Sequence, residues 1–86
     1  MDRYIIDVRE PFEFMIGHIK GAINMPSSKP VSDSGILKDI SKNAEIILYC
    51  RSGSRSAAIA NIMKSIGYTN VINGINMNNI RTKFNI

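Results

Sequence analysis

Cys50 is the only cysteine of the 86-residue chain, and it opens the run Cys-Arg-Ser-Gly-Ser-Arg-Ser, which ends at Ser56. The apolar, strand-forming residues 46–49 lead into this run, and a helical pattern over residues 57–66 follows it. The thiol is therefore expected at a strand-to-helix turn, beneath a loop of small residues whose backbone N–H groups can converge on it. Such N–H groups, the helix N-terminus and the two arginines of the run all stabilise an anion and so lower a thiol pKa.

The small residues of the run have separate expected roles. Ser52, Gly53 and Ser54 are small enough to let the backbone curl around the sulfur, and glycine takes a positive φ at no steric cost. Ser54 and Ser56 are both candidates to cap the following helix. A free thiol has a pKa of about 8.5, so lowering it by about 1.5 units requires about 2 kcal/mol of preferential stabilisation of the anion. A helix N-terminus supplies about 0.3–1 kcal/mol, and convergent N–H groups with a nearby guanidinium supply the rest.

A buried structural cysteine beside a Gly/Ser turn is the plain alternative. It leaves Arg51, Arg55 and the small residues between them without a role. The sequence therefore favours a reactive thiol, in a loop where both arginines attract an anion.

The elements around the run predict an α/β domain. Strands are expected over residues 4–8, 21–25, 46–49 and 71–72, a loop over 27–35, at most two helical turns over 36–40, and helices over 12–16, 57–66 and 77–84. Because strands and helices alternate at short intervals, we expect a mainly parallel central sheet of about four to five strands, flanked by helices. Ligand sites in such folds lie at the carboxyl ends of the strands, and Cys50 falls there.

The helix after the loop is the clearest of these elements. Its apolar residues Ile59, Ile62, Met63 and Ile66 recur at the spacing of one buried helix face. Gly67 is placed to end the helix as its C′ residue.

Composition narrows the classes of function. Hydrophobic residues make up 44% of the chain, which predicts one globular domain over residues 1–86. A single cysteine excludes an internal disulfide and leaves no second thiol in the chain to resolve an intermediate. No apolar run approaches the roughly 20 residues that span a bilayer, so no membrane partner is expected. The formal net charge of +4 comes from scattered basic residues with few aromatics between them, which indicates solvated surface charge rather than nucleic-acid binding.

The start of the chain bears on location. Only three residues precede the first expected strand, which leaves no signal peptide to read. The cytoplasm is the expected location, with the periplasm as the alternative if a leader once preceded residue 1. We expect a monomer.

Four motifs, in order along the chain, resemble one known family. The segments IIDVREPFEF, GHIKGAINMP, IILYCRSGSRSA and GYTNVINGI are similar to those of a single-domain rhodanese, a sulfurtransferase, and the resemblance runs from about residue 5 to residue 75. It implies a small three-layer rhodanese-like fold. The chain is similar to the shortest members, which begin at the IIDVRE strand. The family's closing Gly-Gly…Trp pattern appears here only as the segment 73–76, and the chain has no tryptophan.

The resemblance implies a reaction. Cys50 would attack the sulfane sulfur of a donor such as thiosulfate or polysulfide, hold that sulfur as a persulfide, and pass it to cyanide, a thiol or a protein acceptor. The backbone N–H groups from Arg51 to Ser56 would stabilise the thiolate or persulfide, and Arg51 and Arg55 would attract the anionic donor. This chemistry needs no metal and no organic cofactor.

Other matched residues have supporting roles in this interpretation. Asp7 and Arg9 follow a strand end, where we expect a buried or half-buried pair that ties the fold together beneath the site. His18, the only histidine, is expected to be a hydrogen-bonded structural group rather than a general base. Glu10 and Glu13 are expected to cap or solvate the first helix.

Two alternatives stay open. One is a rhodanese-like binding or regulatory module that holds an anion or a protein without turnover, although such a loop has no need of a thiol. The other is a cysteine-based phosphatase or arsenate reductase. Phosphatases of this kind resemble the present loop but place five residues between cysteine and arginine and commonly a histidine before the cysteine. Here four residues separate Cys50 from Arg55, and Tyr49 precedes the cysteine.

Overall fold

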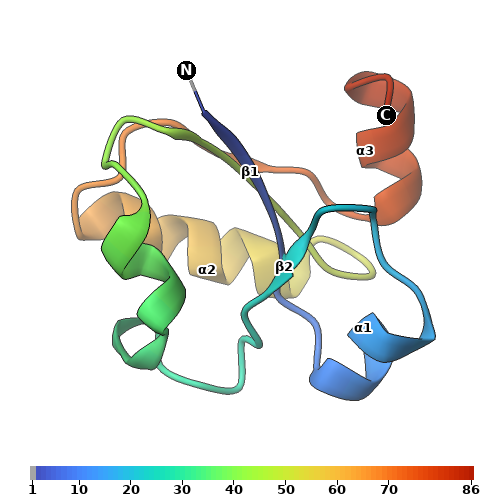
Figure 1. The fold of residues 1–86 in the computed structure, drawn as a ribbon, viewed down its shortest axis with the longest axis horizontal. Coiled ribbons are helices and arrows are strands. Elements are labelled where there is room, and N and C mark those ends of the chain that lie inside the picture. The colour runs from blue at the N-terminus through green and yellow to red at the C-terminus, as the bar shows by residue number, and fades with distance from the viewer. Residues whose placement is uncertain (1) are drawn as a thin grey trace.

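The structure is a computed structural model that describes residues 2–86. Its sheet has four parallel strands in the order β2-β1-β3-β4. The strands are β1 (Arg3–Asp7), β2 (Ile23–Asn24), β3 (Glu45–Tyr49) and β4 (Val71–Asn73). The helices are α1 (Pro11–Ile16), α2 (Ser54–Ser65) and α3 (Met77–Lys83), with two 3₁₀ helices, η1 (Val31–Asp33) and η2 (Gly35–Asp39). Figure 1 shows the sheet between these helices. The expected α/β class and the parallel sheet are confirmed, with four strands.

Two apolar clusters on opposite faces of the sheet make the three layers. On one face Leu48 of β3 packs with Ile59 and Met63 of α2 and with the segment that carries η1 and η2. On the other face Tyr49 packs with Ile80 of α3. Alternate residues of β3 thus serve opposite layers, and β3 is buried on both faces as its continuous apolar sequence predicts.

Several strands and helices begin or end at other residues than expected. The second strand is shorter than the expected 21–25, since only Ile23 and Asn24 pair with β1. The expected loop over 27–35 contains η1, and the turns over 36–40 are the 3₁₀ helix η2. Each of the other expected helices and strands is present, with bounds that shift by up to three residues.

Helix α2 begins earlier than expected, at Ser54 instead of residue 57, and only part of its expected apolar face is buried. Ile59 and Met63 lie in the core, whereas Ile62 and Ile66 are 45% and 47% exposed. The buried residues of this helix are Ser56, Ile59, Ala60 and Met63. Gly67 follows the helix with φ +109°, the left-handed conformation expected of a C′ glycine.

The carboxyl ends of β1 and β3 lie together, because Asp7 pairs with Tyr49 in register. Helix α1 follows β1 at this end of the sheet and contributes no buried residue to the core. Helix α1 therefore lies beside the carboxyl ends of β1 and β3, where the candidate site is expected. Among residues 2–86, no helix is both long and apolar enough to cross a bilayer.

Candidate active site

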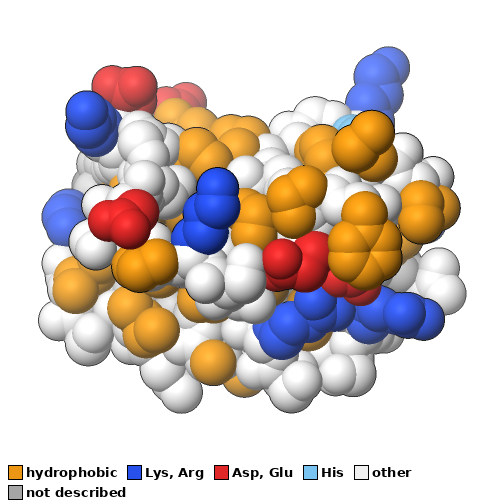
Figure 2. Space-filling model, turned by 90° about the horizontal axis from the view of Figure 1, so that it is seen from below, with side chains coloured by type: hydrophobic (Ala, Val, Ile, Leu, Met, Phe, Trp, Pro, Cys, Tyr) orange, Lys and Arg blue, Asp and Glu red, His pale blue; other side chains and the backbone are white. Residues whose placement is uncertain are grey.

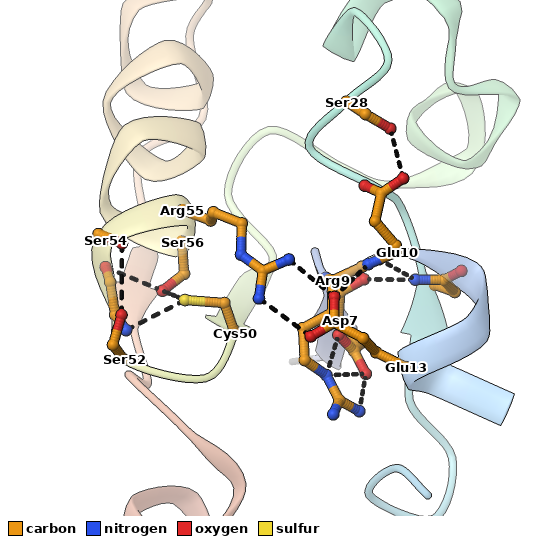
Figure 3. Close-up of polar contacts among 12 residues, drawn as sticks. Asp7, Arg9, Glu10, Glu13, Ser28, Cys50, Ser52, Ser54, Arg55 and Ser56 are labelled. Carbon is orange, nitrogen blue, oxygen red and sulfur yellow. Dashed lines mark hydrogen bonds and ion pairs between the residues drawn. The ribbon is translucent and has the colours of Figure 1, made fainter. Parts of the chain in front are cut away.

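Cys50 lies immediately after β3, at the base of the expected loop (Figure 3). Its side chain is buried, with the residue only 2% exposed. The backbone N–H of Gly53 donates a hydrogen bond to Sγ at 3.0 Å, and the hydroxyl oxygen of Ser56 lies 3.5 Å from Sγ. Gly53 has φ +95°, a conformation that glycine adopts readily, and this turns its N–H toward the sulfur.

The pKa of the Cys50 thiol reflects two opposing effects. Burial raises it, and hydrogen bonds from the Ser56 hydroxyl and from the backbone N–H groups of Ser56, Gly53 and Ser52 lower it by more. The net result is a pKa lowered to about 7. The sulfur is therefore a good nucleophile at neutral pH without a separate general base.

Ser54 and Ser56 were both expected as candidates to cap α2, but neither is its N-cap residue. Gly53 is the N-cap residue, so Ser54 and Ser56 lie inside the first turn. The Ser54 hydroxyl lies 3.3 Å from that of Ser52. The Ser56 hydroxyl lies 2.6 Å from Oδ1 of Asn73 and 3.2 Å from the Gly53 carbonyl oxygen, so its single proton is shared among these acceptors and the Cys50 sulfur. Ser56 therefore links the sulfur to β4.

Asn73, at the end of β4, was not singled out for this role by the sequence. Its Nδ2 donates to the Gly53 carbonyl at 3.1 Å, and its Oδ1 accepts from the Ile75 N–H at 3.0 Å. The Cys50 N–H in turn donates to the Ile75 carbonyl at 3.0 Å. Asn73 and Ile75 thus hold the loop from the side. The sequence feature that could have indicated Asn73 is a polar amide at the end of an apolar strand, next to the strand that leads to the cysteine.

Arg55 makes a contact that the sequence did not indicate. Its two terminal nitrogens donate to the two carboxylate oxygens of Glu13 on α1, at 2.8 and 3.2 Å (Figure 3). Hydrogen bonding from Arg55 lowers the pKa of Glu13 to about 2, so this carboxylate is charged at any physiological pH. Glu13 also accepts from the Glu10 N–H at 2.9 Å, which is the expected capping contact of the first helix.

Arg51 differs from Arg55. It is exposed, and within residues 2–86 it makes no hydrogen bond or ion pair. The two loop arginines, expected to act alike, therefore have different electrostatic surroundings.

Asp7 and Arg9 form the expected buried pair. Oδ2 of Asp7 accepts from Nη2 of Arg9 at 2.6 Å, and Oδ1 accepts from Nε at 2.9 Å. Nη2 also donates to the Gly17 carbonyl at the end of α1, at 2.7 Å. These contacts join parts of the fold to one another. Arg9 also lines the cavity above the sulfur, which is described below.

His18 is placed outside the site. Its ring stacks on that of Phe14, with centroids 3.6 Å apart, and its Nδ1 lies 2.7 Å from the Phe14 carbonyl oxygen. Its expected structural role stays a prediction.

A cavity of about 500 Å³ opens above the sulfur. Its walls come from α1, the Cys50 loop and the start of α3, and are made of Arg9, Phe12, Glu13, Ile16, Gly17, Cys50, Arg51, Asn76, Met77 and Asn78. Within the described part of the chain, no three His, Cys, Asp or Glu side chains are grouped so that they could hold a metal ion. The chemistry that this arrangement offers is attack by a thiolate on a small molecule in the cavity.

Comparisons with known proteins agree with this geometry. A rhodanese-like domain family model matches residues 1–75. A solved structure of a rhodanese with anions from E. coli superposes with a TM-score of 0.79 at 32% identity, covering 91% of each chain. Thiosulfate sulfurtransferase PspE of Escherichia coli is 37% identical over 68 residues, and a sulfurtransferase of Allochromatium vinosum is 32% identical over 73.

The matches cover 79% and 84% of this chain and 64% of each of these two relatives, so the chain spans just under two thirds of their length. The family model and the solved rhodanese cover most of the chain, and the strand–loop–helix around Cys50 lies within the matched residues. The chain belongs to the rhodanese-like domain family.

Proposed function

We propose that this chain, as a single domain over residues 1–86, is a sulfurtransferase that carries sulfane sulfur as a persulfide on Cys50. The observation that supports this most directly is a buried sulfur, with a pKa of about 7, at the base of a cavity and hydrogen-bonded by the loop N–H of Gly53. Two of its relatives are sulfurtransferases, which supports sulfur transfer as the reaction of this chain.

The reaction proceeds in two displacements. The Cys50 thiolate attacks the sulfane sulfur of a thiosulfate-like donor. The Sγ–S bond forms, the donor S–S bond breaks, and its electron pair leaves with sulfite, or with sulfinate from an organic donor. An acceptor nucleophile then attacks the outer sulfur of the persulfide, and Cys50 leaves as the thiolate. Cyanide, an external thiol or a protein thiol can serve as this acceptor.

The loop residues stabilise charge in both steps. The backbone N–H groups of Ser52, Gly53 and Ser56 face the charge on the sulfur. The same donors serve the persulfide anion, because charge-assisted hydrogen bonds strengthen where negative charge develops. Since the chain has one cysteine, the persulfide is discharged to a molecule from outside.

Intact-mass spectrometry tests the proposal. The reduced protein is incubated separately with thiosulfate, benzenethiosulfonate and inorganic polysulfide. We expect a gain of one sulfur, about 32 Da, that is removed by cyanide and absent from Cys50→Ser. Circular dichroism of Cys50→Ser is the control that the variant is folded. No gain with any of the three donors would overturn the proposal and leave an anion- or protein-binding module as the function of this loop.

A further inference from the structure

The charges that border the cavity are mostly paired. Arg9 is held by Asp7, and Arg55 is held by both carboxylate oxygens of Glu13. Of the guanidinium groups near the sulfur, Arg51 alone has no ion pair with the described residues. An incoming donor therefore meets one uncompensated positive charge, with the Glu13 carboxylate on the cavity wall. A second negative charge on the donor would find no second unpaired cation among the described residues of the cavity wall, and removing an unpaired charge from water costs free energy.

The remaining walls are apolar. Phe12 and Ile16 of α1 line the cavity while 66% and 84% exposed, and Met77 lines it from α3. Figure 2, seen from below Figure 1 and hence from the side of α1, shows hydrophobic side chains beside acidic and basic ones over this region. Exposed apolar side chains that border a reactive group gain free energy by covering an apolar part of a ligand.

We propose that this site prefers an organic sulfane donor, one that joins a single negative charge to an apolar group, over the thiosulfate dianion. Organic thiosulfonates make up this chemical class. The proposal rests on the proposed sulfur transfer and names the substrate class of the same site. The single charge faces Arg51, and the organic group lies against Phe12, Ile16 and Met77.

The transfer step balances for such a donor. With R–SO₂–S⁻, the Cys50 thiolate attacks the sulfane sulfur, the Sγ–S bond forms, and the S–S bond of the donor breaks. The electron pair of that bond leaves with the sulfinate R–SO₂⁻. The step needs no oxidant, reductant or co-reactant.

Three probes separate charge from apolar area. Thiosulfate is a dianion, methanethiosulfonate is a small monoanion, and benzenethiosulfonate is a monoanion with an apolar ring. The rate of Cys50 persulfide formation is measured for each by mass spectrometry at low ionic strength. Each rate constant is divided by that of the same donor with free cysteine at equal thiolate concentration, which removes intrinsic reactivity. We expect the normalised rates to rise from thiosulfate to methanethiosulfonate to benzenethiosulfonate.

Two substitutions test the residues that carry the argument. Glu13→Gln keeps the shape of the side chain but removes the charge that offsets Arg55. We expect it to raise the thiosulfate rate relative to methanethiosulfonate about three- to ten-fold, the scale for one charge a few ångströms away near a surface. This gain should shrink with added salt.

Ile16→Ser should lower the benzenethiosulfonate rate about three- to ten-fold and leave that of methanethiosulfonate nearly unchanged, because only the ring reaches the apolar wall. Met15→Ser is the matched control. Met15 precedes Ile16 on the same helix, is 82% exposed and is not among the residues that line the cavity. Its three normalised rates should stay at the unsubstituted values.

The outcomes are distinct. A persulfide that forms from every donor, with thiosulfate as fast as or faster than benzenethiosulfonate after normalisation, would overturn the donor preference and leave sulfur transfer standing. The absence of a persulfide with all three donors would overturn the proposed function itself. An Ile16→Ser effect matched by Met15→Ser would show that α1 acts only through its general apolar surface, which would also contradict the proposed contact.

Discussion

The sulfur of Cys50 combines two properties that usually exclude each other, burial and a lowered pKa. Burial alone would make the thiol inert, since a thiolate in an apolar interior loses its hydration. The hydrogen bonds of the loop, from Ser56 and from the backbone N–H groups, replace that hydration and bring the pKa to about 7. Reactivity at this residue therefore depends on the shape of the loop.

At the residue scale, the reactivity of the thiol should follow this pKa. The rate of alkylation by iodoacetamide should rise with pH, pass its midpoint at about 7 and level off above, because only the thiolate reacts. Ser56→Ala removes a hydrogen bond that lowers the pKa, so its midpoint should move upward by about one unit.

Ser65→Ala is the control for this substitution. Ser65 lies at the other end of α2, where its hydroxyl donates to the Ile62 carbonyl, and its midpoint should stay near 7. An ordinary thiol midpoint in the unsubstituted protein, or no movement in Ser56→Ala, would contradict the hydrogen-bonded thiolate.

At the scale of elements, the Cys50 loop and the turn between β4 and α3 hold each other in unusual backbone conformations. Gly53 has φ +95° and Ile75 has φ +73°. A Cβ atom on Gly53 would lie 3.2 Å from Cγ2 of Ile75, closer than a comfortable contact. The loop N–H that faces the sulfur is thus fixed by a turn from the adjacent strand.

Gly53→Ala should therefore damage the site beyond its local backbone strain. A positive φ at a non-glycine residue costs about 1–2 kcal/mol, and the new methyl group must also displace Ile75. We expect a lower free energy of unfolding in urea and a thiol midpoint shifted upward, because the Gly53 N–H moves away from Sγ.

Gly21→Ala separates these two effects. Gly21 has φ +85°, but a Cβ atom there would have no neighbour within 4 Å. This variant should lose a similar amount of stability from backbone strain and keep the unsubstituted thiol midpoint. A Gly53→Ala protein with an unchanged midpoint would show that the turn does not position the loop.

These contacts indicate which parts of the site a sequence can predict. The β3 strand, the loop and α2 are contiguous, so their order placed Cys50 correctly at the carboxyl end of the sheet. The Arg55–Glu13 pair joins residues 42 positions apart, and nothing local distinguishes Glu13 from a helix-capping carboxylate. The link from Ser56 to Asn73 likewise depends on β4 lying beside β3. Ile62 looked buried by spacing alone, because spacing does not give the width of the surface against which a helix packs.

At the scale of the whole molecule, the buried Asp7–Arg9 ion pair joins the sheet to the end of α1 beneath the site. Asp7 ends β1, and Arg9 reaches from it to the Gly17 carbonyl at the end of α1. The Arg9 guanidinium also lies over the Tyr49 ring of β3, 5.5 Å from its centroid. The pair therefore sets where α1, and with it Glu13 and Ile16, lies relative to the Cys50 loop.

Breaking this pair should destabilise the whole domain. Asp7→Asn leaves the Arg9 charge buried without a counter-ion, which typically costs about 3–5 kcal/mol, whereas a domain of this size is stable by only about 4–13 kcal/mol. We expect a large fall in the urea midpoint at pH 7. The double variant Asp7→Asn with Arg9→Met removes the uncompensated charge as well, so it should recover part of the lost stability. If the single variant stays within about 1 kcal/mol of the unsubstituted protein, or the double variant is no more stable than the single one, the pair does not hold these elements together.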